Sequence, residues 1–420
     1  MKILVVGGGG REHALVWKIS QSPLVDKIYC APGNGGISDL AECIPVKAMD
    51  IEGVVKFSKE KGIDMVMVAP DDPLAAGMVD ALENEGIRAF GPRKNAAVIE
   101  GSKAFSKELM KKYNIPTAKY ATFTNSTEAI EYLSNQNSYP IVVKADGLAL
   151  GKGVVIAGSF EEARDAVNSM MNDKVFGEAG NCVVIEEFMK GPEVSVLAFT
   201  DGKTVVPMVS AQDHKRALDN DQGLNTGGMG AFSPSKIYTP ELASICMKTI
   251  FKPTIDAMNA ENRKFKGVLY FGLMLTDEGP KVLEYNARFG DPETQAVLPR
   301  LKTDLIEIFN AVIDEKLSEI KIEWMDKAAV CIILASGGYP QKYQTGYEIS
   351  GLNEAAKLPD ITVFHAGTKK ENGKYYTAGG RVLGVTATGA TADIAISKAY
   401  EAVKSISFEK MHYRRDIGRK

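Results

Sequence analysis

The residues best placed to do chemistry are Glu284, Asn286 and Arg288, which alternate with Tyr285 and Ala287 after an apolar run. In a β-strand, residues two apart project from the same face, so a carboxylate, an amide oxygen and a guanidinium would lie side by side. Mg²⁺ accepts such oxygen ligands and completes its octahedron with substrate phosphates and waters. A guanidinium suits an anionic substrate group. A surface ion pair is the alternative interpretation.

A lysine at a strand end, followed by a glycine loop that carries a second lysine, suggests a site for a polyphosphate. Lys144 ends an apolar run, and the segment 147–153 that follows contains Gly151, Lys152 and Gly153. A lysine supplies a fixed positive charge, and glycines supply backbone N–H groups and the freedom to hinge like a lid. The segment is not a P-loop, because Gly153 stands where that motif needs Ser or Thr. An ordinary surface turn is the alternative.

The glycines Gly7–Gly10 follow an apolar run and precede a helical pattern. Such a loop brings backbone N–H groups and a helix N-terminus to an anion. The spacing excludes the dinucleotide fingerprint, because Glu12 and His13 stand where its last glycine would be. The loop therefore predicts a cradle for a phosphorylated compound other than a dinucleotide, or a tight turn without a ligand.

Glu186, Glu187 and Phe188 come directly after another apolar run, and Glu193 follows a Gly-Pro turn. This order suits a nucleotide hinge, in which exposed backbone pairs with adenine and a carboxylate holds the ribose hydroxyls. A solvated acidic turn has the same composition, so the spacing leaves both interpretations open.

His214 lies between Asp213 and Lys215, in a stretch that packs an acid, an imidazole and two cations closely. The imidazole could carry a proton, or it could position its neighbours. The segment Asn225–Gly230, which includes Thr226, Gly227 and Gly228, is too rich in glycine for a plain connection.

The elements that must position these residues follow from the pattern of apolar runs. In the first hundred residues, short apolar runs alternate with helical patterns, which predicts βαβ units and a parallel sheet. Ligands of such sheets bind at the carboxyl ends of the strands. Those ends are four loops rich in glycine or proline, at residues 7–10, 32–36, 69–73 and 91–92.

Later segments predict a mixed α+β arrangement with two hairpins, one turning at Asp201-Gly202 and the other at Asp277-Glu278-Gly279. From about Ala328 the chain is rich in strands and closes with a helix. We therefore expect an α/β and α+β multidomain fold. Its expected parts are an N-terminal parallel-sheet domain (1–102), a core domain (103–327) with a small subdomain at about 122–192, and a C-terminal strand-rich domain (328–420).

Composition limits the class of protein. The 420 residues carry 50 Lys and Arg against 53 Asp and Glu, so no general positive excess exists to bind nucleic acid. Five scattered cysteines without a CxxC pair are typical of reduced thiols in the cytoplasm. The first apolar run is too short for a signal peptide, and no run of about 18 apolar residues could span a membrane. We expect a cytoplasmic protein without nucleic-acid or membrane partners.

The motifs taken together resemble one family, the phosphoribosylamine–glycine ligases, or glycinamide ribonucleotide synthetases, of the ATP-grasp superfamily. The matching stretches run in family order from one end of the chain to the other. They are Gly8–Leu15, Ala31–Asn34, Phe90–Pro92, Glu100–Lys103, Lys144–Ala149, Gly151–Val154, Ile185–Phe188, Gln212–Arg216, Asn225–Gly230, Arg288–Gln295 and Arg415–Gly418.

The resemblance implies ATP-dependent joining of glycine to 5-phosphoribosylamine in purine biosynthesis, through a glycyl phosphate. It implies an ATP-grasp core with a mobile lid subdomain, in a stand-alone monomeric enzyme, and it implies these site residues. ATP would bind at Lys103, Lys144, Gly151, Lys152, Gly153, Glu186, Glu187, Phe188 and Glu193. The other substrates would bind at Gly9, Gly10, Asn34, Asp71, Asp213, His214, Lys215, Thr226, Gly227, Gly228 and Arg288. Arg288, Asp213 and Lys144 would serve catalysis, and Glu284 and Asn286 would hold Mg²⁺ or Mn²⁺.

One departure concerns the substrate side. Asp71 stands where the family usually has a glutamate, so its contact with phosphoribosylamine depends on a shorter side chain. Two other functions stay open at this point. One is a related ATP-grasp ligase or carboxylase that uses bicarbonate on a phosphoribosyl compound. The other is a nucleotide-binding regulatory protein without turnover, which would not need the paired oxygen ligands of Glu284 and Asn286.

Overall fold

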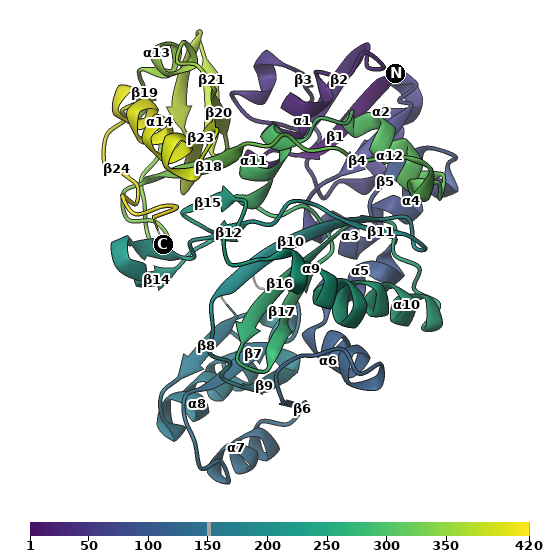
Figure 1. The fold of residues 1–420 in the computed structure, drawn as a ribbon, viewed down its shortest axis with the longest axis vertical. Helices are drawn as coiled ribbons and strands as arrows, with labels where there is room; N and C mark the ends of the chain where they lie inside the picture. Colours follow the sequence, from purple (N-terminus) through teal and green to yellow (C-terminus); the bar gives the residue numbers. More distant parts are fainter. Residues whose placement is uncertain (149–152, 420) are drawn as a thin grey trace.

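In the computed structural model, which describes residues 1–148 and 153–419, the N-terminal region is a parallel sheet with helices on both faces (Figure 1). The strand order is β3-β2-β1-β4-β5. The strands are β1 (Lys2–Gly7), β2 (Lys27–Pro32), β3 (Glu42–Cys43), β4 (Met65–Val68) and β5 (Arg88–Phe90). The helices are α1 (Gly10–Ile19), α2 (Ile51–Lys61), α3 (Asp71–Ala76), α4 (Met78–Asn84) and α5 (Lys94–Gly101). The predicted parallel sheet is confirmed, and the four predicted loops all leave its carboxyl edge.

Side chains of β1 are buried on both faces of this sheet, as expected for a parallel sheet between helices. Ile3 and Val5 belong to one apolar cluster, and Leu4 and Val6 belong to the other. Helix α12 (Leu305–Ile313), far away in sequence, covers the first of these faces. The N-terminal sheet and the later part of the chain therefore share their core.

A second sheet lies at the far end of the molecule (Figure 1) and has the order β6-β9-β7-β8. Its strands are β6 (Tyr120–Phe123), β7 (Ile141–Ala145), β8 (Val154–Ala157) and β9 (Val183–Glu187). The nearby helices are α6 (Lys103–Lys112), α7 (Ser126–Ser134) and α8 (Phe160–Val167). The strands β7 and β9 pack with α7 and α8 into an apolar cluster of their own. This separate core supports the expected small subdomain, although its boundaries stay a prediction.

The central antiparallel sheet has the order β11-β10-β16-β17. Its strands are β10 (Glu193–Thr200), β11 (Val205–Pro207), β16 (Gly267–Thr276) and β17 (Gly279–Asn286). Helices α9 (Pro240–Cys246), α10 (Lys252–Ala260) and α11 (Glu293–Val297) accompany it. Both predicted hairpins are confirmed, because β10 pairs with β11 and β16 pairs with β17.

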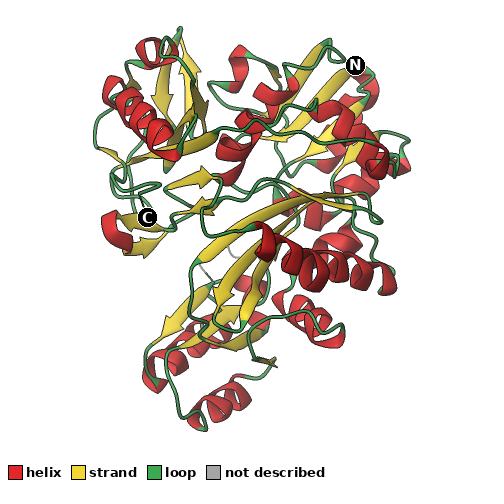
Figure 2. Ribbon diagram, in the orientation of Figure 1, coloured by secondary structure: helices red, strands yellow, loops and turns green. Residues whose placement is uncertain are grey.

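The C-terminal sheet takes two strands from the middle of the chain. Its order is β12-β15-β18-β23-β20, and β24 pairs with β18. The strands are β12 (Gln212–Asp213), β15 (Gly230–Ser233), β18 (Ala328–Ser336), β20 (Ile361–His365), β23 (Arg381–Gly389) and β24 (Met411–His412). Figure 2 shows β12 and β15 as short strands reaching from the central region toward the C-terminal one. The 213–230 segment is thus tied to both regions.

Smaller elements complete the fold. Two short hairpin-like sheets are β13 (Arg216–Leu218) with β14 (Gln222–Asn225), and β19 (Glu348–Ile349) with β22 (Lys374–Thr377) and β21 (Thr368–Glu371). The C-terminal helices are α13 (Leu352–Ala356) and α14 (Ala392–Ser405). All five cysteines are free thiols. In the described part of the chain, no helix combines the length and apolar character that crossing a membrane requires.

We predict that Phe309→Ala weakens the junction between α12 and the N-terminal sheet. Phe309 is fully buried and stacks on Phe90 with ring centroids 3.8 Å apart. Truncating a buried phenylalanine costs about 3–5 kcal/mol of folding free energy, which denaturant unfolding measures. Phe309→Leu, which leaves a smaller cavity, should cost less. Equal stability of Phe309→Ala and the parent chain would contradict this packing.

Candidate active site

Glu284 and Asn286 share one face of β17 because they lie two residues apart after a β-bulge. The register with β16 shifts between Gly272 and Leu273, so Leu283 on β17 is the extra residue. Val282 before the bulge and Tyr285 after it are buried, whereas Glu284 and Asn286 are half-buried. The sequence prediction that these two oxygen ligands lie side by side therefore agrees with the strand geometry.

Four cations act on the carboxylate of Glu284. Lys215 Nζ lies 3.8 Å from its Oε1, and the charges of Lys144, Lys103 and Arg288 also reach it. Burial opposes ionisation of Glu284, but these cations outweigh it and hold its pKa below the usual range. Glu284 is therefore anionic at neutral pH and lies in strongly positive surroundings, which favour a polyphosphate.

Glu186 pairs with two lysines at once. Its carboxylate lies 3.0 Å from Lys107 Nζ and 2.9 Å from Lys144 Nζ, and all three side chains are almost wholly inaccessible to solvent. Burial lowers the pKa of Lys107 to about 8, although the Glu186 charge opposes this. One buried carboxylate therefore compensates two buried cations from α6 and β7.

Sequence reasoning missed Lys107, although a signal was present. Lys103 and Lys107 are four residues apart in α6, so they lie on one face of the helix. Lys103 Nζ donates a hydrogen bond to the carbonyl of Gly147 at 2.7 Å, which connects α6 to the start of the predicted lid. Gly151 and Lys152 lie outside the described residues. Gly153 is described, and its carbonyl accepts a hydrogen bond from the Ala145 N–H.

The predicted nucleotide hinge connects to the same cations. Glu193 lies 2.6 Å from Lys215 Nζ, so Lys215 bridges Glu193 and Glu284. Glu187 accepts a hydrogen bond from the Lys119 backbone N–H at 2.9 Å. The ring of Phe188 is exposed. The structure thus brings the predicted hinge and the predicted metal-binding strand to one site.

Asp213 faces this site, whereas His214 does not. The ring of His214 is buried and lies against Phe232, with centroids 5.9 Å apart. Burial raises the pKa of Asp213 to about 7, Lys215 opposes the shift, and Glu293 strengthens it. Asp213 can therefore exchange a proton near neutral pH.

Behind Asp213 lies a buried network that sequence reasoning missed. Ser195 Oγ and the Tyr270 hydroxyl lie 2.8 Å apart. Both donate to Glu293 Oε1, at 3.2 Å and 3.1 Å respectively. The ring of Tyr270 is buried. No local spacing links these three residues, so the fold alone reveals the network.

Arg288 is held by a partner that the sequence did not single out. Its Nη2 lies 3.0 Å from Glu100 Oε1 and 3.4 Å from Asn286 Oδ1. Glu100, at the end of α5, also accepts the Ala287 N–H at 2.7 Å. The charge of Asp71 acts on both Arg288 and Glu100. Glu100 therefore fixes the strand end that carries Arg288, and Asp71 lies toward the same group.

The glycine cradle at Gly7–Gly10 is already partly occupied by protein groups. Glu12 Oε2 accepts the Gly9 N–H at 2.6 Å, and Arg11 lies 2.6 Å from Glu12 Oε1. Arg11 also donates to the Phe289 carbonyl at 3.2 Å. The cradle therefore lies against the 289–295 segment that follows Arg288. Its phosphate-binding role stays a prediction, because Glu12 already takes the Gly9 amide.

Asn34 holds the cradle in place. Its Nδ2 donates to the Gly8 and His365 carbonyls, and its Oδ1 accepts the N–H groups of Gly36 and Ile37. These bonds give Asn34 a structural role at the boundary with the C-terminal region. A substrate contact of Asn34 would have to compete with them.

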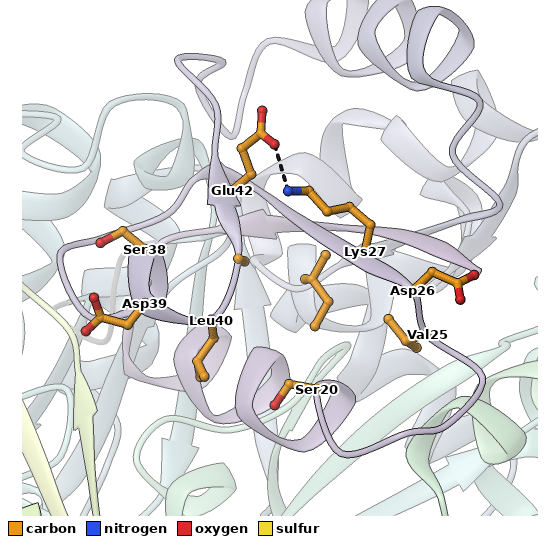
Figure 3. A pocket seen from close by; sticks show the side chains of 10 residues that line it. Ser20, Val25, Asp26, Lys27, Ser38, Asp39, Leu40 and Glu42 are labelled. Carbon is orange, nitrogen blue, oxygen red and sulfur yellow. Dashed lines mark ion pairs between the residues drawn. The ribbon is translucent and has the colours of Figure 1, made fainter.

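A surface cavity of the N-terminal region lies elsewhere. It measures about 500 Å³ and opens between α1, β2 and β3. Figure 3 shows its rim, where Lys27 and Glu42 form an ion pair of 2.9 Å, and where Asp39 and Leu40 lie on the other side. It contains none of the predicted site residues, so we place the active site at the converging cations instead.

The residues present fit a phosphate-bound divalent ion. Among residues 1–148 and 153–419, no three His, Cys, Asp or Glu side chains gather to hold a metal by themselves. Glu284 and Asn286 offer two hard oxygen ligands among several cations. Such a donor set suits a metal that keeps phosphate oxygens and water as its other ligands.

Comparisons with known proteins cover nearly the whole chain. The family model for the N domain of phosphoribosylglycinamide synthetase matches residues 1–100, that for its ATP-grasp (A) domain matches 101–294, and that for its C domain matches 329–420. A phosphoribosylamine–glycine ligase of Caldanaerobacter subterraneus subsp. tengcongensis is 50% identical over 99% of both chains. One of Clostridium acetobutylicum is 48% identical over 100% of both.

Solved structures agree with these sequence matches. The crystal structure of a phosphoribosylamine–glycine ligase from Thermotoga maritima is 33% identical, with a TM-score of 0.85 over 99% of this chain and 100% of that one. A biotin carboxylase from Campylobacter jejuni has a TM-score of 0.75 over 98% and 92% of the two chains, at 13% identity. The second likeness shows a shared fold alone.

We predict that Asp213→Asn makes the ligand-free protein more stable at alkaline pH. Because the folded state raises the pKa of Asp213 to about 7, the fold favours its protonated form. The wild-type chain then loses stability as pH rises from the ordinary carboxyl range through that value.

Thermal unfolding from about pH 5 to about pH 8 measures the effect. The gain from Asp213→Asn over the wild type should grow with pH. Asp165→Asn, which alters an exposed carboxylate of α8, should show no such trend. A gain that is constant across the range would contradict a titrating Asp213.

Proposed function

The chain belongs to the phosphoribosylglycinamide synthetase family, and on that premise we propose how its residues carry out the reaction. It is an ATP-dependent ligase that joins glycine to 5-phosphoribosylamine in purine biosynthesis, giving glycinamide ribonucleotide, ADP and phosphate. ATP is the co-substrate.

The observation that carries the assignment of the site is the convergence of cations on Glu284. Lys215, Lys144, Lys103 and Arg288 all act on this one half-buried carboxylate. Cations held close together in a partly dry site favour a ligand with several negative charges. A second glycine-rich edge, at Gly7–Gly10, lies beyond Phe289 and suits a separate phosphorylated substrate.

The chemistry requires activation of glycine. An amine cannot displace oxide from a carboxylate at neutral pH. A carboxylate oxygen of glycine therefore attacks the γ-phosphorus of ATP, and the bond between that phosphorus and the bridging oxygen breaks to release ADP. The phosphoribosylamine nitrogen then attacks the acyl carbon of glycyl phosphate, inorganic phosphate leaves, and the nitrogen loses a proton. Positioning and charge neutralisation supply most of the catalysis.

We assign the nucleotide side to residues from the core and the small subdomain. Lys103 and Lys144 bind phosphates, with Lys107 and Glu186 beside them. Glu186, Glu187 and Phe188 surround the adenine, and Glu193 meets the ribose. The segment 147–153, with Gly151, Lys152 and Gly153, covers the phosphates and excludes water, which would hydrolyse glycyl phosphate.

We assign the substrate side to the opposite wall. Arg288, held by Glu100, binds an anionic substrate group. Asp213 binds an amine and accepts its proton, a role that its pKa of about 7 supports. The remaining residues assigned to glycine and phosphoribosylamine are Gly9, Gly10, Asn34, Asp71, Lys215, Thr226, Gly227 and Gly228, whereas His214, buried against Phe232, is left out.

Glu284 and Asn286 are the residues that would hold Mg²⁺ or Mn²⁺. When bound there, the ion would neutralise negative charge on the ATP phosphates. The pair lies on the face of β17 that meets Lys215, so the ligands and the lysines would act on the same phosphates.

We further propose a monomeric enzyme of the cytoplasm. The residues assigned to the site all come from one chain, so the proposal needs no second copy. Five free thiols, without a disulfide, suit a reducing compartment.

We predict that Glu284→Gln lowers turnover on the order of 100-fold, the loss typical of removing one electrostatic group aimed at the transition state. Steady-state ADP release at limiting Mg²⁺ measures it, and circular dichroism should show an intact fold. Glu278→Gln, an exposed carboxylate in the turn of the same hairpin, is the matched control. If Glu284→Gln and the control both turn over like the wild type, the metal assignment is wrong.

We predict that full ADP release needs ATP, glycine and phosphoribosylamine together. Phosphoribosylamine is unstable and is generated in the assay from ribose 5-phosphate and ammonia. Omission of glycine or of phosphoribosylamine should leave little ADP release. Bicarbonate that replaced glycine without loss would favour a carboxylase. Turnover with aminoimidazole ribonucleotide in place of phosphoribosylamine would show that the substrate side is misassigned.

A further inference from the structure

Arg381, the first residue of β23, connects the C-terminal region to two segments of the candidate active site. Its Nη2 lies 3.2 Å from the Asp291 carboxylate, and its Nη1 donates to the Asp291 carbonyl at 3.0 Å. The same Nη1 donates to the carbonyls of Gly227 and Gly228. One guanidinium therefore joins the glycine turn at 226–228 to the segment that follows Arg288.

The other side of the glycine turn is held by Lys215. The N–H and the hydroxyl of Thr226 both donate to the Lys215 carbonyl, at 2.7 Å and 2.9 Å. The Gly228 N–H donates to Thr226 Oγ1 at 3.0 Å. From the C-terminal region, the Tyr339 hydroxyl accepts the Gly227 N–H at 3.0 Å. The turn is thus fixed between a residue of the cation cluster and two residues of the C-terminal region.

The close approach of these groups explains why the turn contains two glycines. A Cβ on Gly227 would lie 3.1 Å from Arg381 Cζ and 3.3 Å from the Tyr339 hydroxyl oxygen. Gly228 has φ of +107° and would place a Cβ 2.4 Å from Pro292 Cδ. A side chain is therefore excluded at Gly228, and one at Gly227 would press on Arg381 and Tyr339.

Asp291 extends these contacts to the N-terminal cradle. Gln295 Nε2 donates to Asp291 Oδ1 at 2.7 Å, and the Arg11 charge also acts on Asp291. Arg11 itself donates to the Phe289 carbonyl. Arg381 thus completes a set of contacts in which the N-terminal loop, the 289–295 segment and the glycine turn hold one another.

We propose that Arg381, assisted by Tyr339, is a positioning residue that sets the shape of the substrate side of the active site. The inference rests on the proposed function, because it takes the glycine turn to line the site for glycine and phosphoribosylamine. Arg381 acts through the turn and through Asp291. A planar guanidinium with several fixed donors can serve a carboxylate and three carbonyls at once, which a lysine cannot do.

Three of the residues assigned to the nucleotide lie outside this contact set, whereas Glu193 reaches it through Lys215. Lys103, Lys144 and Glu186 are carried by α6, β7 and β9. Their described hydrogen bonds and ion pairs are with Lys107, Gly147 and Leu283 and with one another, not with the C-terminal region. Loss of Arg381 should therefore change the KM of glycine or of phosphoribosylamine more than the KM of ATP.

The test compares Arg381→Met, Arg381→Lys and Tyr339→Phe in steady-state kinetics with all three substrates. In Arg381→Met, the loss of charge-assisted hydrogen bonds should raise the KM of glycine, of phosphoribosylamine or of both about ten-fold. The KM of ATP should stay unchanged. Arg381→Lys should restore part of the loss, and Tyr339→Phe should show a smaller loss of the same kind. Lys398→Met, which removes an exposed ion pair with Asp360 in the same region, is the control.

A readout that does not depend on turnover accompanies the kinetics. Hydrogen exchange of the Gly227 and Gly228 amides should be faster in Arg381→Met than in the wild type or in Lys398→Met. Equal increases in the KM of all three substrates, or a lower melting temperature with every KM unchanged, would show a merely structural role and overturn the proposal. Unchanged exchange at the turn would overturn it as well.

The proposed function and the positioning role of Arg381 fail on different results. If the wild type does not release ADP with glycine and phosphoribosylamine, the proposed function is wrong, whatever the variants do. If the wild type does so and Arg381→Met keeps every KM, the function stands and the positioning role is wrong.

Discussion

The active site depends on one physical constraint, which is that buried cations need buried anions. Lys107 and Lys144 are almost inaccessible to water and share the carboxylate of Glu186. Lys215 is shared in turn by Glu193 and Glu284. Charges taken out of water are tolerated only when they are paired. These carboxylates therefore let the fold gather several lysines at one place before any polyphosphate binds.

The fold brings these charged side chains together from several elements. The cations come from the helix α6 and from β7, the segment after β12 and the segment after β17, and these three strands belong to different sheets. A bulge in β17 turns Glu284 and Asn286 toward them. The shared core beneath β1 and β10 fixes the central sheet against the N-terminal one. On the substrate side, Glu100 holds Arg288 in place, and Arg381 holds the glycine turn in place.

Much of the fold and of the candidate site could be predicted from the sequence, because those parts depend on local periodicity and short motifs. Apolar runs located the parallel sheet and both hairpins, and alternation along β17 placed Glu284 beside Asn286. Lys107 was accessible too, through its spacing from Lys103. Arg381 and Tyr339 were not, because they meet Gly227 only after more than a hundred residues of intervening chain have folded. The entry of β12 and β15 into the C-terminal sheet is a tertiary pairing with no local signal.

The central claim is that the clustered cations exist to bind a polyphosphate. The most direct measurement is the rise in melting temperature caused by adenosine, AMP, ADP and ATP, all at one common concentration with Mg²⁺ present. The account predicts that the rise increases with the number of phosphates, because each added phosphate replaces protein carboxylates as the partner of the lysines. Equal stabilisation by adenosine and ATP would contradict it.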